Sequence, residues 1–193
     1  MLSILQDLAL LGSAIYATIP SFWLSFHPFA AHWRKRGRSA FKALLPLWML
    51  YIAMAVLALW PWRHRTLYST LYSYVAGAIP VVVGLLLYRA AARGFTHVQL
   101  SGLAEVEPDR HDQRLVTTGI RSRVRHPIYL GHLCELLGWT VAFGTLSLFV
   151  LSVLAIATGA LMLHLEDNEL EARFGETYRA YRHAVPAIFP RVF

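Results

Sequence analysis

Long apolar runs separated by short basic segments constrain this chain more than any other feature of its sequence. A helix that crosses a bilayer needs roughly 20 mostly apolar residues, and residues 8–26, 43–62 and 68–91 each provide such a run. A fourth tract, residues 128–165, is too long for one crossing and about right for two, with a hairpin near Gly144. We therefore expect an all-α integral membrane helical bundle of about five transmembrane helices.

The composition agrees with a chain that lies in lipid. Only 15% of the residues are charged, whereas soluble domains average about 25%, and the mean hydropathy is +0.46. We expect a single membrane domain over residues 1–193. Its parts are three N-terminal spans in residues 1–91, a cytoplasmic loop at 92–127, a helical hairpin at 128–165 and a tail with a cytoplasmic helix at 166–193.

Basic residues are distributed asymmetrically between the predicted loops. In a five-span arrangement all of the 18 Lys and Arg residues except Arg63 and Arg65 fall on one side, which the positive-inside rule assigns to the cytoplasm. The C-terminus then faces the cytoplasm and the N-terminus faces outward. Topology and lipid headgroups explain the net charge of +7 better than nucleic acid does. The sequence shows no secretory or organelle signal, so we expect a prokaryotic inner membrane.

The densest group of polar residues lies at 119–129, where the loop enters the fourth predicted span. Pro127 suits the first position of that helix, because its missing N–H would be unpaired there anyway. The positive end of the helix beside Arg125 and His126 would favour a carboxylate or a phosphate. His126 and Tyr129 are three residues apart and share a helix face. A positive-inside anchor and a simple helix cap would also explain these residues.

A second polar group, Glu166-Asp167, ends the fifth predicted span. Glu166 falls on the same helical stripe as Leu170 and Phe174, so it points into protein if that stripe packs inward. A carboxylate at membrane depth is usually paired or functional, and an ammonium group is its obvious complement, although the pair could also be an ordinary charged start to a tail helix. The two groups together complement the amino-acid end of S-adenosylmethionine, which carries both an amine and a carboxylate.

The sequence offers no pattern typical of a metal site. Cys134 is the only cysteine, which excludes a disulfide within the chain, and the histidines show no ligand spacing. No Gly-rich phosphate loop and no Ser/His/Asp set stands out. We therefore expect no bound metal, and the residues give no indication of the oligomeric state.

Two motifs in a fixed order resemble the signature of the isoprenylcysteine carboxyl methyltransferase and phospholipid methyltransferase superfamily. The resemblance covers about residues 113–190. The matching residues are Leu115-Val116, Gly119, Arg125-His126-Pro127, Tyr129, Glu166-Asp167, Phe174-Gly175, Tyr178 and Tyr181.

The resemblance implies an integral membrane enzyme that uses S-adenosylmethionine. The adenine would lie near the backbone of Leu115 and Val116, and His126 and Glu166 would hold the methionine portion. The tail tyrosines would help to close the site. The residues implied in cofactor binding are Gln113, Leu115, Val116, Arg121, His126, Pro127, Tyr129, Glu166 and Tyr178. Arg125, His126 and Tyr129 are positioning candidates, and no catalytic residue is assigned.

Two positions depart from the superfamily pattern. Arg121 stands where members usually have a tyrosine, so one cofactor contact is expected to differ. Met162 stands where members that methylate prenylated cysteine have an arginine that contacts the substrate carboxylate. Met162 is therefore our candidate substrate-binding residue, and the acceptor is expected to be a lipophilic small molecule or another prenylated or lipid group that enters from the bilayer. A carboxylate acceptor would need no general base, whereas an amine or hydroxyl would need one.

Two other functions remain open from the sequence. Membrane sterol or enone reductases that use NADPH share a related H-P-x-Y segment, but they usually carry an Arg-Asp and a Lys-Cys pair. This chain has Glu166-Asp167 and Glu169-Leu170 at those places. A non-catalytic membrane subunit is the third possibility, and it predicts that no cofactor binds.

Overall fold

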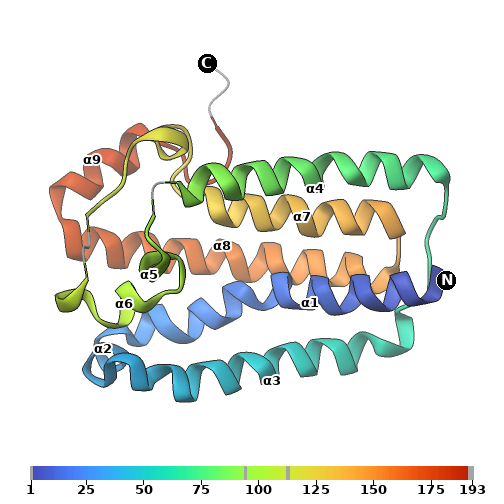
Figure 1. The fold of residues 1–193 in the computed structure, drawn as a ribbon, viewed down its shortest axis with the longest axis horizontal. Helices are drawn as coiled ribbons and strands as arrows, with labels where there is room; N and C mark the ends of the chain where they lie inside the picture. Colours follow the sequence, from blue (N-terminus) through green and yellow to red (C-terminus); the bar gives the residue numbers. More distant parts are fainter. Residues whose placement is uncertain (1, 94, 112–113, 191–193) are drawn as a thin grey trace.

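The long apolar runs fold into five long helices that lie side by side (Figure 1). The computed structural model describes residues 2–93, 95–111 and 114–190. The long helices are α1 (Leu2–Phe26), α3 (Phe41–Leu59), α4 (Leu71–Ala92), α7 (Pro127–Phe143) and α8 (Leu146–Phe174). The described residues form no named β-strand, and the all-α bundle expected from the sequence is confirmed.

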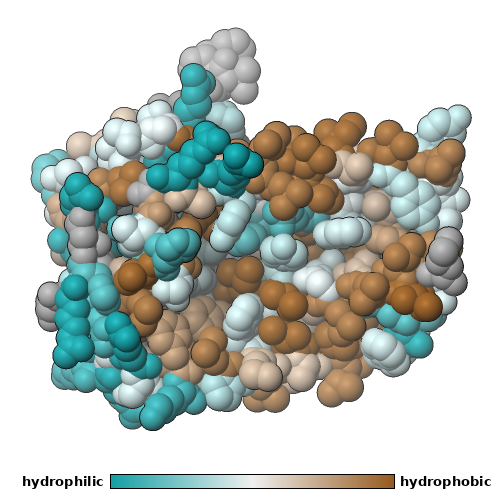
Figure 2. Space-filling view, in the orientation of Figure 1, coloured by the Kyte–Doolittle hydropathy of each residue, from teal (hydrophilic) through white to brown (hydrophobic). Residues whose placement is uncertain are grey.

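Short helices connect the long ones, mostly at one end of the bundle. They are η1 (His27–Phe29), α2 (Ala30–Arg36), η2 (Gly37–Ala40), η3 (Trp60–Trp62), α5 (His97–Leu100), α6 (Leu103–Val106), η4 (Pro108–Arg110), η5 (Gly119–Ser122) and α9 (Glu176–Ala184). We call the end that carries α2, α5, α6 and α9 the polar end, because hydrophilic residues gather there in Figure 2.

The outer faces of the long helices are apolar. Large hydrophobic side chains such as Leu57, Ile79 and Val153 are more than 60% exposed. On the face shown in Figure 2, hydrophobic residues cover much of the surface of the long helices. Three helical segments of the described chain are long and apolar enough to cross a membrane, and the first of them, Leu2–Trp62, contains both α1 and α3. Helix α7, with 17 residues, is shorter than all three. Apolar side chains facing outward are the arrangement expected of an integral membrane protein.

The hairpin between α7 and α8 forms where the sequence predicts it. Gly144 has φ +59°, a left-handed conformation that favours glycine, and it ends α7. The loop between α3 and α4 pairs with this turn: the N–H of Leu67 donates to the carbonyl of Gly144 at 2.8 Å, and the N–H of Leu146 donates to the carbonyl of Arg65 at 2.8 Å. The turn is thus fixed from both sides.

Glycines bring α4 and α7 into close contact. Gly77 and Gly84 on α4 face Gly138 and Gly131 on α7, and a Cβ atom built on Gly77 would lie 2.4 Å from the carbonyl oxygen of Gly138. Small residues at such positions allow helix backbones in membranes to approach each other. Both helices repeat glycine at an interval of seven residues, a pattern that the sequence contains and that our sequence analysis overlooked.

Two helices extend beyond the apolar runs of the sequence. The first helix begins at Leu2 rather than at residue 8. Helix α8 continues without a break to Phe174, so Glu166 and Asp167 lie inside it and do not begin a separate tail helix. Helix α8 ends just before Gly175, where φ is +58°, and the chain turns there into α9.

Candidate active site

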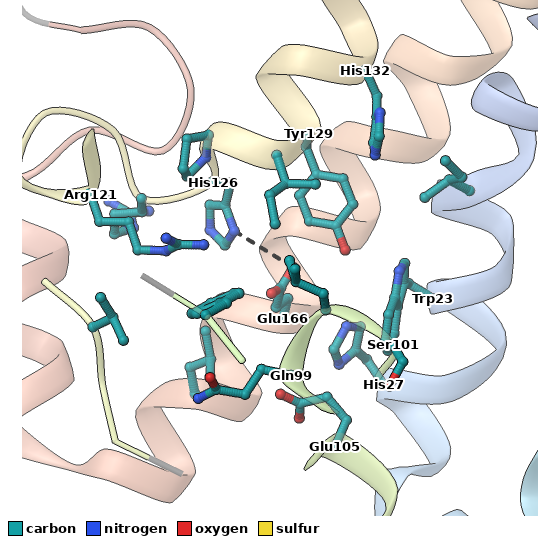
Figure 3. A pocket seen from close by; sticks show the side chains of 18 of the residues that line it. Trp23, His27, Gln99, Ser101, Glu105, Arg121, His126, Tyr129, His132 and Glu166 are labelled. Atoms are coloured by element: carbon teal, nitrogen blue, oxygen red, sulfur yellow. Dashed lines mark ion pairs between the residues drawn. The ribbon is translucent and has the colours of Figure 1, made fainter. Parts of the chain in front are cut away.

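A cavity of about 650 Å³ opens at the polar end of the bundle. Its wall is formed by α1, α3, α4, α7, α8, α9 and the segment between α4 and α7. We call the region near the polar end its polar part. It includes His27, Glu105, Arg121, His126 and Glu166, which are labelled in Figure 3, and also Glu169. We call the region between the long helices its apolar part, which includes Tyr16, Ile19, Phe22, Leu45, Trp48, Leu85, Tyr88, Ile128, His132 and Glu135.

A buried carboxylate organises one side of the polar part. Asp167 is 4% exposed and accepts hydrogen bonds from Arg125 Nη2 at 2.5 Å, from His126 Nε2 at 2.9 Å and from the hydroxyl of Tyr178. Burial alone would raise the pKa of Asp167, but the hydrogen bonds from His126 and Arg125 outweigh it and hold that pKa below its usual range. Asp167 is therefore an anion that joins α7, α8 and α9.

The start of α7 is also fastened to the chain that follows α9. Pro127 is the first residue of α7, as the sequence predicts. Just before it, the N–H of Arg125 donates to the carbonyl of Pro186 at 2.9 Å and the N–H of His126 donates to that of Ala187 at 3.0 Å. Arg125 Nη1 donates to the carbonyl of Val185 as well. These bonds hold residues 185–187 against the start of α7.

Glu166 points into the cavity beside His126 (Figure 3). Glu166 Oε2 lies 3.6 Å from His126 Nδ1 and is buried, yet it has no hydrogen-bond partner among the described residues. A buried carboxylate oxygen without a donor is costly unless a ligand or water satisfies it. The structure therefore leaves an acceptor in the wall of the cavity that an ammonium or another donor can satisfy.

A second ion-paired group forms the opposite wall of the polar part. Glu169 Oε1 lies 2.5 Å from Arg34 Nη2, and Glu169 Oε2 lies 3.4 Å from His27 Nδ1. Arg173 joins the group through Glu105, at 3.0 Å. These residues come from four separate elements, and our sequence analysis did not connect them. This group fixes α8 to the loop after α1 and to α6.

Arg121, which stands in place of the superfamily tyrosine, is buried at 6% exposure. Its Nη1 donates to the carbonyl of Ala91 at 2.9 Å, and its guanidinium carbon lies 3.7 Å from the centre of the Phe95 ring. The hydroxyl of Tyr181 donates to the carbonyl of Arg121 at 2.7 Å. Arg121 thus places a cation in the cavity wall while it connects α4, η5 and α9.

Most of the site residues expected from the sequence meet in this cavity. Those that line it are Leu115, Val116, Arg121, Arg125, His126, Pro127, Tyr129, Glu166 and Tyr178. Gln113 lies outside the described residues. Met162 is fully buried and is not part of the cavity wall. From the sequence, Asp167 belonged to a motif without an assigned role, and no role was expected for His27, Glu169, His132 or Glu135.

Comparison with known families agrees with this geometry. A family model described as phospholipid methyltransferase matches residues 72–177, which is more than half of the chain. The chain belongs to the phospholipid methyltransferase family. The match extends from α4 through α7 and α8 to the start of α9, so it contains His126, Glu166 and Asp167. It confirms the resemblance that the two sequence motifs indicate.

The chain is also similar to three individual proteins. The chain is 28% identical to methanethiol S-methyltransferase 2 of Bradyrhizobium diazoefficiens over 89% of its own length and 64% of the relative's. It is 30% identical to the protein-S-isoprenylcysteine O-methyltransferase of Schizosaccharomyces pombe, over 53% of this chain and 41% of that protein. It is 37% identical to the cobalt-zinc-cadmium resistance protein CzcN of Cupriavidus metallidurans, over 43% and 38%.

The chain thus spans less than two thirds of the length of each of these three relatives. No solved structure gives a significant match.

Proposed function

We propose that this member of the phospholipid methyltransferase family transfers a methyl group from S-adenosylmethionine to a lipophilic acceptor. The observation that carries the proposal is the buried, unpartnered Oε2 of Glu166 beside His126, in a cavity that continues between the long helices. The positive-inside rule supports placing the polar end, and with it the cofactor, on the cytoplasmic side.

The residues of the polar part suit the cofactor. The carboxylate of Glu166 would accept a hydrogen bond from its ammonium, and the guanidinium of Arg121 supplies a positive charge for its carboxylate. Leu115 and Val116 lie in the cavity wall, where an adenine would contact their backbone. When bound, the cofactor supplies a methyl group on an electrophilic sulfonium. Tyr178 and Tyr181, held by Asp167 and Arg121, would keep water from the site.

The apolar part suits the acceptor. Aromatic and aliphatic side chains such as Phe22, Leu45 and Trp48 line it between α1 and α3, and an acceptor could reach it from the bilayer. Transfer from a sulfonium is an in-line displacement, so the protein mainly has to align the two reactants and exclude water. The names of two methyltransferase relatives, which refer to a small thiol and to prenylated cysteine, make lipophilic thiols the first acceptors to test.

The NADPH alternative fits the charges of the cavity less well. Its polar part contains the carboxylates of Glu105, Glu166 and Glu169 and also four arginines, Arg114, Arg121, Arg125 and Arg173. Arg125 and Arg173 are already paired with Asp167 and Glu105, whereas Glu166 Oε2 has no hydrogen-bond donor among the described residues. A dinucleotide brings a pyrophosphate and a further phosphate, and like charges in a site of low polarity repel each other. A zwitterionic amino-acid group is the better complement.

The proposal is tested by methyl transfer in proteoliposomes. The purified protein, incubated with methyl-labelled S-adenosylmethionine, is expected to label a long-chain alkyl thiol more than phosphatidylethanolamine or farnesylcysteine. Labelling of any of the three supports a lipophilic acceptor. If a protein that binds S-adenosylhomocysteine labels none of them, while it labels a water-soluble thiol, the acceptor proposed here is wrong.

Glu166→Gln is expected to weaken the binding of S-adenosylhomocysteine about 10- to 100-fold, because an amide cannot replace the charge that a carboxylate offers to an ammonium. Isothermal titration calorimetry in detergent measures the change. Glu171→Gln is the matched control, since Glu171 lies on the same helix but pairs with Arg179 and Arg182 outside the cavity. Equal affinity in both variants would exclude Glu166 as a cofactor ligand.

A further inference from the structure

The apolar part of the cavity contains a group of polar residues deep between the helices. His132 on α7 lies between two tyrosines, with ring centroids 5.2 Å from Tyr16 on α1 and 5.7 Å from Tyr88 on α4. Glu135, one turn further along α7, is 4% exposed, and its carboxylate interacts with the hydroxyl of Tyr16. All four residues line the cavity. Polar groups at this depth are costly in a membrane protein, and they usually mark a functional site.

His132 has an unused nitrogen. Its Nδ1 is buried, and no group in the described part of the chain forms a hydrogen bond with it. A neutral imidazole carries one acceptor nitrogen, and a buried acceptor without a donor needs a partner from a ligand or from water. Because His132 forms part of the cavity wall, that partner can be the molecule that occupies the apolar part.

The position of His132 fits the place where the two reactants would meet. His126, Tyr129, His132 and Glu135 follow one another at intervals of three residues, and Figure 3 shows Tyr129 and His132 on the same side of α7. A helix rises 1.5 Å per residue, so His132 lies about 9 Å beyond His126 along the axis. This places it in the apolar part, which suits the acceptor, less than two helical turns beyond the polar part, which suits the cofactor.

The charges of the apolar part favour an uncharged acceptor. None of the described residues that line it is a Lys or an Arg, and Glu135 adds an acidic group. A carboxylate acceptor would find no cation there and would be repelled by Glu135. A neutral thiol carries no such charge, but its proton must leave when the sulfur is methylated.

We propose that His132 is the catalytic base that accepts this proton, and that the acceptor is a neutral lipophilic thiol. The inference rests on the methyl transfer proposed above. The S–H proton moves to Nδ1 of His132, and the thiol sulfur forms a bond to the methyl carbon. The bond from that carbon to the sulfonium breaks, and its electron pair remains on the departing thioether. The products are a methyl thioether, S-adenosylhomocysteine and a protonated His132, which later releases its proton to water.

Glu135 and Tyr16 act as positioning residues. The carboxylate of Glu135 lies three residues from His132 on the same helix and stabilises the imidazolium that forms. The rings of Tyr16 and Tyr88 both pack against the imidazole. The titratable groups that line the cavity around His132 are Tyr16 on α1, Tyr88 on α4, and Tyr129 and Glu135 on α7.

The test compares two thiols of similar size in the full-length protein reconstituted in vesicles. An alkyl thiol is mostly protonated at neutral pH and needs a base, whereas an aromatic thiol with electron-withdrawing groups is already ionised. The ionised thiol is expected to have the higher KM beside Glu135, so the comparison is made on kcat at saturating thiol. His132→Gln is expected to lower kcat for the alkyl thiol about 100-fold or more, and to change kcat for the aromatic thiol less than about threefold. Raising the pH towards the pKa of the alkyl thiol is expected to restore much of its rate. His164→Gln, an exposed histidine on α8, is the control.

The possible results separate this inference from the function on which it rests. An equal loss for both thiols, or no loss for the alkyl thiol, overturns the role of His132. Labelling of amines but not thiols by the unaltered protein overturns the acceptor class. If the unaltered protein does not bind S-adenosylhomocysteine, the proposed function itself fails. A variant is taken to be folded if its affinity for S-adenosylhomocysteine is within twofold of that of the unaltered protein. If His132→Gln is not folded by this criterion, His132→Asn replaces it in the test.

Discussion

Asp167→Ala is expected to abolish methyl transfer and to weaken the binding of S-adenosylhomocysteine about 100-fold or more. The substitution leaves Arg125, His126 and the hydroxyl of Tyr178 without the acceptor that joins them. Removal of one partner from a buried ion pair typically costs about 3–5 kcal/mol, because the remaining charge is left unpaired. His126 would lose its orientation towards Glu166. Tyr178 on α9 would no longer be joined through Asp167 to Arg125 and His126 at the start of α7.

The contribution of Asp167 to the stability of the protein is expected to depend on pH. The pKa of Asp167 is lowered in the folded protein, since the hydrogen bonds from His126 and Arg125 outweigh burial. Its contribution to stability is therefore complete above the usual Asp pKa of about 3.9 and is lost as the pH falls through the lowered pKa. The stability difference between the unaltered protein and Asp167→Asn should be constant near neutral pH and should shrink below about pH 4.

Thermal unfolding in detergent, followed by circular dichroism, measures this difference. Asn168→Ala is the control, because Asn168 is the next residue of α8 and is exposed. Unchanged stability and unchanged ligand affinity in Asp167→Ala would show that the network around Asp167 does not hold the site together.

Gly138→Val is expected to destabilise the bundle by about 3 kcal/mol or more, at the upper end of the cost of overpacking. A Cβ atom on Gly138 would lie 2.5 Å from Val81 Cγ2 and 2.7 Å from the carbonyl oxygen of Gly77. Backbone cannot yield as a flexible side chain can, so α4 and α7 would have to separate. The cavity, which both helices line, would lose its shape as well.

Gly12→Ala is the control for this substitution, because a Cβ atom on Gly12 would meet nothing within 4 Å. Alanine has the higher helix propensity, so Gly12→Ala is expected to leave the stability equal or slightly higher. Chemical denaturation in detergent compares the two variants. If Gly138→Val unfolds at the same denaturant concentration as Gly12→Ala, the close contact of α4 and α7 is not needed for stability.

The helices were largely predictable from the sequence, because apolar length alone decides which segments can cross a bilayer. The turn at Gly144 and the start of α7 at Pro127 were also predictable, since each depends on a local backbone preference. The extension of α8 to Phe174 was not. Its charged residues resemble the start of a soluble tail until their partners, such as Arg34 for Glu169 and Arg125 for Asp167, are brought from distant segments.

The site was predictable to the extent that its residues are close in sequence or belong to a known motif. His126, Tyr129 and Glu166 meet in the cavity as expected. The central position of Asp167 depends on donors from α7 and α9 that only the fold brings together. His132 was not among the expected site residues, because its unsatisfied nitrogen and its place in the cavity wall cannot be read from spacing.

Calorimetric binding of S-adenosylhomocysteine and of NADPH to the purified protein tests the central claim most directly. We predict that S-adenosylhomocysteine binds, that NADPH does not, and that both His126→Ala and Glu166→Gln weaken the binding. Binding of NADPH alone would contradict the methyltransferase function and favour a reductase. Binding of neither ligand to a folded protein would contradict it as well and favour a non-catalytic membrane subunit.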